Sequence, residues 1–146
     1  MKTGKTFIPC EKDFARKTYL INADGKTLGR LATCVATLLI GKRKTVFAYD
    51  KLSGDNVVVI NAKGIHVTGK KVDDKFYNHY TGYPDGLRIY SFGTLMEKKP
   101  EEIILRAVSR MLPKNKLGRE MLRRLRVYAG SEHAQQAQQP VTLEVS

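Results

Sequence analysis

The chain has 146 residues, which is the usual size of one globular domain, and 42% of them are hydrophobic, enough to build a core. Lysine and arginine number 26 against 14 aspartate and glutamate, a formal net charge of +12 that would repel itself unless a polyanion supplied the opposite charge. Nucleic acid is therefore the expected partner, and a membrane is not, because the apolar runs are only a few residues long.

The cysteines and the start of the chain predict an intracellular protein. Cys10 and Cys34 have neither the number nor the spacing of a disulfide framework or of a metal site. The first residues, MKTGKTFIPC, lack the continuous apolar segment of a secretory signal. We therefore expect a reducing compartment, and we expect no cofactor.

The first half of the chain predicts a strand, a helix and a second strand. Residues 1–17 are polar and basic around one apolar patch at Phe7 and Ile8, as in an arm that lies on something else. Residues 19–21 predict a short strand, and residues 22–25 a turn. Apolar residues at helical spacing predict a helix that Gly41 ends. Its apolar face comprises Leu28, Leu31, Ala32, Val35, Leu38 and Leu39.

Residues 57–60 are β-branched and apolar without alternation, which predicts a strand buried on both faces. With the preceding strand and helix they form a βαβ unit with a right-handed crossover. Ile65 and Val67 predict a short extended segment after this strand. Residues 76–80 predict an aromatic-rich strand, and residues 81–86 predict a loop.

The second half predicts two helices and a last strand. Pro100 starts a helix whose apolar face is Ile104, Ala107, Val108, Met111 and Leu112, and Pro113 ends it. Residues 117–125 predict a second short helix, residues 127–129 a strand, and the polar tail a segment that is mobile or ordered only against a partner. We thus expect an arm at residues 1–17, one domain at residues 18–130 and a tail at residues 131–146.

Basic clusters are the most informative feature of the sequence. Residues 98–126 hold ten cations against three acids, and Arg119, Arg123 and Arg126 would form one stripe along the second short helix, opposite its leucines. Such a stripe costs helix stability unless something neutralises it. Arg106 and Arg124 could instead pair with the glutamates four residues before them. Arginine suits phosphate binding, so RNA contact is favoured over a plain solvated surface.

Aromatic residues around the loop at 81–86 suggest a second mode of RNA contact. Tyr83 and His79 could stack on unpaired bases or pack into the sheet, and the sequence leaves the two alternatives open. For Phe76 the core is favoured.

No motif predicts catalysis. Gly25-Lys26-Thr27 lacks the upstream glycine of a phosphate-binding loop, and residues 64–71 lack its hydroxyl residue and precede a poor helix. The three histidines are scattered, and no paired carboxylates or nucleophile elbow appear. The alternative function of a different class is a small doubly wound enzyme that uses a nucleotide, since βαβ units commonly host nucleotide-binding sites.

Residues 111–133, MLPKNKLGREMLRRLRVYAGSEH, resemble the large-subunit ribosomal protein L13 family. Further matches follow in order: GKTLGRLAT at 25–33, VVVINAKGIHVTGKK at 57–71, HYTGYPDGL at 79–87 and QQP at 138–140. Such a series is far more specific than any one motif. It departs from the family pattern at Thr18, where a Trp is usual, at residues 48–53, which lack a Pro-His pair, and at Arg110, where a Gly is usual.

The resemblance implies a three-layer α/β/α domain around a mostly parallel four-stranded sheet. It implies a structural constituent of the large ribosomal subunit that binds large-subunit (23S-type) rRNA, supports subunit assembly, contacts neighbouring large-subunit proteins and catalyses nothing. The resemblance also implies a location in the ribosome, in a bacterial cytoplasm or an organelle interior. It implies neither a membrane partner nor a small-molecule substrate. An RNA-binding translational regulator acting off the ribosome is the alternative.

Residues in basic clusters or beside the aromatic loop are the RNA-binding candidates. They are Lys42, Arg43, Lys44, Lys70, Lys71, His79, Tyr83, Arg110, Lys114, Lys116, Arg119, Arg123, Arg124 and Arg126.

Overall fold

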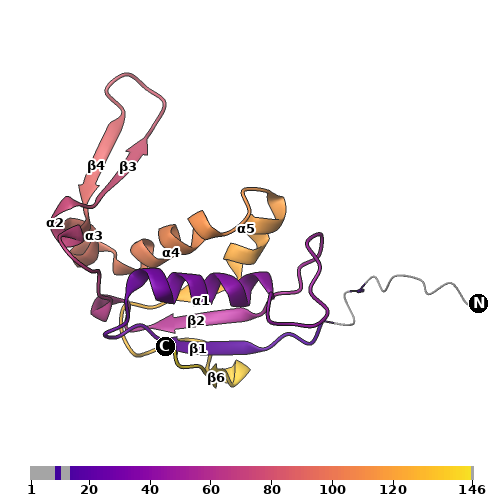
Figure 1. Ribbon diagram of the computed structural model, residues 1–146. Helices are drawn as coiled ribbons and strands as arrows, with labels where there is room; N and C mark the ends of the chain where they lie inside the picture. Colours follow the sequence, from indigo (N-terminus) through magenta and orange to yellow (C-terminus); the bar gives the residue numbers. More distant parts are fainter. Residues whose placement is uncertain (1–8, 11–13, 146) are drawn as a thin grey trace, which may run out of the picture.

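The computed structural model describes residues 9–10 and 14–145, and Figure 1 shows helices packed on one sheet with a hairpin standing away from it. The main sheet contains β1 (Thr18–Asn22), β2 (Asn56–Ile60), β5 (Leu125–Val127) and β6 (Val141–Thr142). The hairpin is β3 (Phe76–Tyr80) and β4 (Leu87–Ser91). The helices are α1 (Leu28–Ile40), α2 (Lys71–Asp74), α3 (Phe92–Lys98), α4 (Pro100–Met111) and α5 (Lys116–Arg123), with 3-10 turns η2 (Ala62–Gly64) and η3 (Gln136–Gln138).

The main sheet has the order β5-β2-β1-β6, and its neighbouring strands are all parallel. Val57, Val58 and Val59 of β2 are all buried, although successive side chains of a strand point to opposite faces. Both faces are therefore covered, as the apolar run predicted. The prediction of a three-layer α/β domain around a mostly parallel four-stranded sheet is confirmed.

Helix α1 lies along the sheet over β2 and β1 (Figure 1). Its predicted apolar face is buried throughout. Gly41 follows the helix at φ 83°, a left-handed conformation that favours glycine, and its N–H closes the last turn on the carbonyls of Thr37 and Leu38. The predicted end of this helix is confirmed.

Helix α4 begins at Pro100, as predicted, and packs against α1. Its buried face differs slightly from the prediction, because Ile103 is fully buried while Met111 is 44% exposed. Helix α5 is shorter than predicted: it ends at Arg123, and the chain then enters β5 at Leu125. The expected stripe along one helix is therefore wrong, since Arg126 lies on a strand.

The hairpin was predicted only in part. Strand β3 and its loop are confirmed, but β4, α2 and α3 were not foreseen. Phe76 was expected in the core and is 59% exposed, so that prediction is wrong. The hairpin has contact with the rest of the domain mainly at its base, where α2 and α3 lie.

The tail and the arm both contact the sheet domain. In the tail, β6 pairs with β1, the Leu143 N–H donates to the Leu20 carbonyl, and Val145 is buried. In the arm, Phe14 is buried, while Phe7 and Ile8 lie outside the described residues. The division into arm, domain and tail stays a prediction, but part of the tail belongs to the sheet. Among the described helices, none has the length and apolar character to cross a membrane.

Candidate nucleic-acid interface

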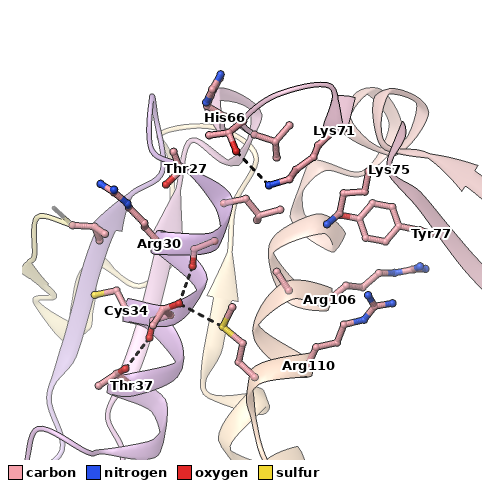
Figure 2. Close-up of a pocket in the computed structure, with 18 of the residues that line it drawn as sticks. Thr27, Arg30, Cys34, Thr37, His66, Lys71, Lys75, Tyr77, Arg106 and Arg110 are labelled. Carbon is pink, nitrogen blue, oxygen red and sulfur yellow. Dashed lines mark hydrogen bonds between the residues drawn. The ribbon is translucent and has the colours of Figure 1, made fainter. Parts of the chain in front are cut away.

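A groove of about 1100 Å³ opens over α1, α4 and the segment that leads into the hairpin. Figure 2 shows α1 with Arg30, Cys34 and Thr37 on one side and α4 with Arg106 and Arg110 on the other. Six cationic side chains line it, and we call this surface the α1–α4 groove. They are Arg30, Arg43, Lys71, Lys75, Arg106 and Arg110.

The amphipathic pattern of the two helices places the arginines in the groove. Helix α1 buries Leu28 and Leu31 on the sheet, so Arg30 between them is exposed. Helix α4 buries Ile104 and Val108 in the same way. Arg106 and Arg110 are one turn apart and therefore share a face of α4.

The groove carries far more positive than negative charge. Its lining holds one carboxylate, Glu144, against the six cations. Of the six cations, only Arg106 forms an ion pair within the described residues, and its partner is Glu102, 3.0 Å away on the same helix. This ion pair is one of the two intrahelical pairs that the sequence offered, and it is confirmed. The remaining cations have their charge available for a polyanion.

Tyr77 lines the groove beside α4, and its ring makes cation–π contacts with two of the cations. Its ring centroid lies 5.6 Å from Lys75 Nζ and 5.5 Å from Arg106 Cζ, distances at which a cation is attracted to an aromatic face. Burial raises the pKa of the Tyr77 phenol, an effect that the charges of Arg110 and Arg106 oppose. The phenol therefore stays neutral at physiological pH and does not cancel any of the positive charge.

The α1 side of the groove is lined with uncharged polar side chains. The Thr33 hydroxyl donates to the Gly29 carbonyl, and the Thr37 hydroxyl to the Thr33 carbonyl, so both are held against the helix. At the far end of α1, Arg43 Nη2 lies 3.8 Å from Cys34 Sγ. The α1 side of the groove therefore combines threonine hydroxyls with the cations Arg30 and Arg43.

Three of the predicted RNA-binding residues lie in the groove: Arg43, Lys71 and Arg110. Lys42 and Lys70 are exposed and directly precede two of these in the chain. The Lys71 ammonium also donates to Thr68 Oγ1 at 3.3 Å. Residues from three separate clusters of the sequence therefore meet at one surface.

A second basic surface lies around α5. The Asn115 side chain caps this helix by accepting the Gly118 N–H at 2.8 Å, and Gly118 packs so closely that a Cβ there would meet the Pro113 carbonyl. Arg123 pairs with Glu120 at 2.8 Å, which replaces the predicted pair of Glu120 with Arg124. Predicted residues exposed on this surface are Lys114, Lys116, Arg119, Arg123 and Arg126.

Two predicted RNA-binding residues are engaged in contacts within the protein. Lys44 pairs with the buried Asp55 at 2.6 Å and donates to the Ala15 carbonyl at 2.8 Å. Arg124 Nη1 donates to the Gly54 carbonyl at 2.8 Å, and burial, followed by the charge of Arg16, lowers its pKa. We call Lys44, Asp55 and Arg124 the loop clamp, because they hold the segment between α1 and β2.

His79 and Tyr83, the two aromatic candidates, lie on the hairpin. His79 is exposed on β3 opposite Arg88, and Tyr83 is 75% exposed in the loop. The structure therefore leaves both rings uncovered by the described part of the chain. The packing alternative does not apply to Tyr83.

Three cations of the groove were not predicted to bind RNA: Arg30, Lys75 and Arg106. Arg106 lies in the basic cluster at residues 98–126 but was set aside because it could pair with Glu102, and neither Arg30 nor Lys75 was counted in a basic cluster. The polar positions Thr27, Arg30, Thr33 and Thr37 do form a stripe along the predicted helix, and that stripe could have indicated the groove. Within the described part of the chain, no group of three or more His, Cys, Asp or Glu side chains could hold a metal ion.

Comparisons with known proteins agree on one family. The model of the family described as "Ribosomal protein L13" matches residues 16–134. The chain belongs to the ribosomal protein L13 family. One similar relative, from Geobacter sulfurreducens, is 49% identical over 99% of this chain and 100% of its own length. Another, from Clostridioides difficile, is 53% identical over 95% of this chain and 97% of its own.

Both relatives are named "Large ribosomal subunit protein uL13", and a relative from Aeromonas salmonicida with the same name is 48% identical over 97% of this chain. The resemblance of the chain to the L13 family is thus confirmed. The part of the chain that matches the L13 family model contains all six cations of the α1–α4 groove and all of α5.

Proposed function

We propose that this protein is a structural constituent of the large ribosomal subunit that binds large-subunit rRNA through the α1–α4 groove and the basic surface of α5. The relatives from Geobacter sulfurreducens and Clostridioides difficile are named as a large-subunit protein, and the match covers 100% and 97% of their lengths. The net charge of +12 gives this chain the electrostatic character that such a partner requires.

The observation that carries the proposal is the charge of the groove. Six cations from four separate segments line it, and one of them is in an ion pair within the described chain. Like charges gathered in this way repel one another unless a polyanion neutralises them. Arginine is well suited to bind the phosphates of such a polyanion, because its planar guanidinium binds phosphate with two parallel hydrogen bonds.

The two basic surfaces would bind different parts of the RNA. Helices α1, α4 and α5 lie on the same side of the main sheet (Figure 1). The groove, flanked by Lys42 and Lys70, would hold phosphates along the backbone of one RNA segment. The exposed cations of α5 and Arg126 would hold a second segment, and His79 and Tyr83 would stack on unpaired bases at the hairpin.

Lys44 and Arg124 do not belong to the proposed RNA surface. Each already has an oxygen partner within the protein, in the loop clamp. Their role would be to hold the fold that presents the groove. The protein would carry out no catalysis, and its location would be the ribosome, in a bacterial cytoplasm or an organelle interior, next to other large-subunit proteins.

RNA binding measured against salt concentration tests this proposal. A variant with Arg30→Gln, Lys75→Gln and Arg110→Gln removes three groove charges, none of which has an acidic partner among residues 9–10 and 14–145. Its affinity for purified large-subunit rRNA should fall, and the slope of log K against log salt should decrease by about 2 to 3, because each lost phosphate contact accounts for about 0.7–0.9.

A matched control carries Lys63→Gln, Lys98→Gln and Lys99→Gln. These three lysines are exposed and lie outside the groove lining, so the control loses the same formal charge. It should keep nearly the wild-type slope. Equal slopes for the two triple variants would show that net charge, rather than the groove, attracts the RNA.

A further inference from the structure

One face of the β3–β4 hairpin exposes four large apolar side chains. Phe76 and Tyr80 lie on β3, and Leu87 and Ile89 on β4, and each is between 56% and 64% exposed. The register pairs Tyr80 with Leu87 and Asn78 with Ile89, and directly paired residues of an antiparallel hairpin share a face. These four side chains form one continuous surface, which we call the apolar hairpin face.

The orientation of this face is fixed by Tyr77. Tyr77 is buried at the base of the hairpin, against Arg106 of α4. Because side chains alternate along a strand, Phe76 and Asn78 on either side of Tyr77 point away from the domain. In Figure 1 the hairpin stands clear of the main sheet, with α2 and α3 at its base. The described part of this chain therefore leaves the apolar hairpin face open.

Such a hairpin is expected to need a partner. A two-stranded hairpin alone is marginally stable in water, and it gains stability when something packs on its apolar side. The four side chains expose on the order of 400 Å² of surface, as much as the largest apolar patch of a typical monomeric protein, and such patches are often interaction sites.

The charge of the two hairpin faces distinguishes their partners. The other two positions on the apolar face are Asn78 and Ser91, so this face has no cation to neutralise a phosphate. His79 and Arg88 form a cross-strand pair on the opposite face, the same face as Tyr77 of the groove. RNA fits the opposite face, and an uncharged apolar surface fits the apolar face.

A second copy of this chain is a poor occupant. Two apolar hairpin faces packed together would bury on the order of 800 Å² in total, below the roughly 1,200–2,000 Å² of stable protein interfaces. A segment of a different protein that also contacts the flanks of the hairpin can bury more area.

We propose that the apolar hairpin face binds an uncharged, apolar segment of a neighbouring protein of the large subunit. The hairpin thereby separates its two partners, with RNA on the face that carries His79 and Arg88 and protein on the face that carries Phe76, Tyr80 and Ile89. This inference rests on the proposed function, since it places the protein in the large subunit.

Site-specific photo-cross-linking in assembled large subunits tests the inference. Benzoylphenylalanine replaces Ile89 in one full-length chain and Arg88 in another, so that the two probes are adjacent in sequence but on opposite faces. Large subunits are isolated first, and the cross-linked products are then identified by mass spectrometry. We expect a different protein at position 89 and RNA at position 88, and we expect Tyr80→Ser with Leu87→Ser to abolish the protein product.

The outcomes separate this inference from the proposed function. RNA, a second copy of this chain, or no product at position 89 overturns the inference while the chain is present in large subunits. A protein product that persists in the Tyr80→Ser, Leu87→Ser chain also overturns it, because the apolar face is then not what binds. If the wild-type chain is absent from large subunits, the proposed function fails, and this inference fails with it.

Discussion

The loop clamp and the α1–α4 groove are both rich in cations, but their cations have opposite surroundings. In the clamp, Lys44 lies 2.6 Å from the carboxylate of Asp55, and Arg124 donates to a loop carbonyl. In the groove, Arg30, Lys75 and Arg110 line an open surface and have no acidic partner within the described residues. The clamp therefore contributes to the fold, whereas the groove is available for a ligand.

This difference shows that the role of a cation depends on the oxygens around it. A cation that is partly buried and paired costs stability when its partner is removed, because a charge is then left without compensation. An exposed cation without a partner contributes little to folding but can bind a phosphate. Substitutions in the clamp should thus change stability, and substitutions in the groove should change RNA binding.

The largest expected effect is that of Asp55→Ala. The Asp55 carboxylate is buried, pairs with Lys44 and accepts the backbone N–H of Lys17 at 2.9 Å. Its loss should lower the free energy of unfolding by about 2–4 kcal/mol, because both partners lose a charged acceptor in a partly buried site. Urea denaturation measures the change, and a loss below about 0.5 kcal/mol would remove the clamp from the account.

Two adjacent arginines give the next test. Arg124→Ala should lower the free energy of unfolding by about 1–3 kcal/mol, because the Gly54 carbonyl loses a charged donor. Arg123→Ala, the matched control, removes a largely exposed side chain and should change stability by less than about 0.5 kcal/mol. RNA affinity should respond in the opposite order. Equal losses of stability for the two variants would contradict the assignment of Arg124 to the fold and Arg123 to the RNA surface.

A single groove substitution should have a smaller effect, and mainly on RNA binding. Arg110→Gln should change the free energy of unfolding by about 0.5 kcal/mol or less, the favourable interaction of one cation with the last turn of α4. The salt slope of rRNA binding should decrease by about 0.7–0.9, as for one phosphate contact. A large loss of stability with an unchanged slope would assign Arg110 to the fold.

The smallest effect concerns Tyr77 at alkaline pH. Its pKa is raised by burial above the ordinary value of 10.0, so the unfolded chain releases the phenolic proton before the folded chain does. The stability from this group is present below pH 10 and is lost as pH rises towards the raised pKa. Tyr77→Phe should make the decline of unfolding free energy above pH 10 shallower, and an unchanged decline would contradict the cause given for the shift.

The elements with strong periodicity could be predicted from the sequence. Helix α1 and strand β2 follow directly from their apolar patterns, and Gly41 and Pro100 mark real helix ends. The end of α5 could not be predicted, because Leu125 continues the helical spacing of Leu117 and Met121 although it lies on a strand. The spacing of apolar residues alone did not distinguish the end of the helix from the start of the strand.

The site could be predicted only where its residues are neighbours in the chain. The clusters around Arg43, Lys71 and Arg110 were found, but nothing in the sequence showed that folding brings them to one groove. The partners of Lys44 and Arg124 also come from distant segments, so their engagement in the clamp could not be foreseen. Phe76 was misplaced because an apolar strand residue does not reveal whether its own chain covers it.

The most direct test of the central claim is sedimentation of cell extracts through sucrose gradients at moderate and then high salt. The wild-type chain, the groove variant (Arg30→Gln, Lys75→Gln, Arg110→Gln) and its charge-matched control are followed by mass spectrometry. The wild type and the control should travel with the large subunit through the salt wash, while the groove variant should be released at lower salt. A wild-type chain that stays at the top of the gradient would contradict the ribosomal assignment, and a groove variant retained like the control would contradict the role of the groove.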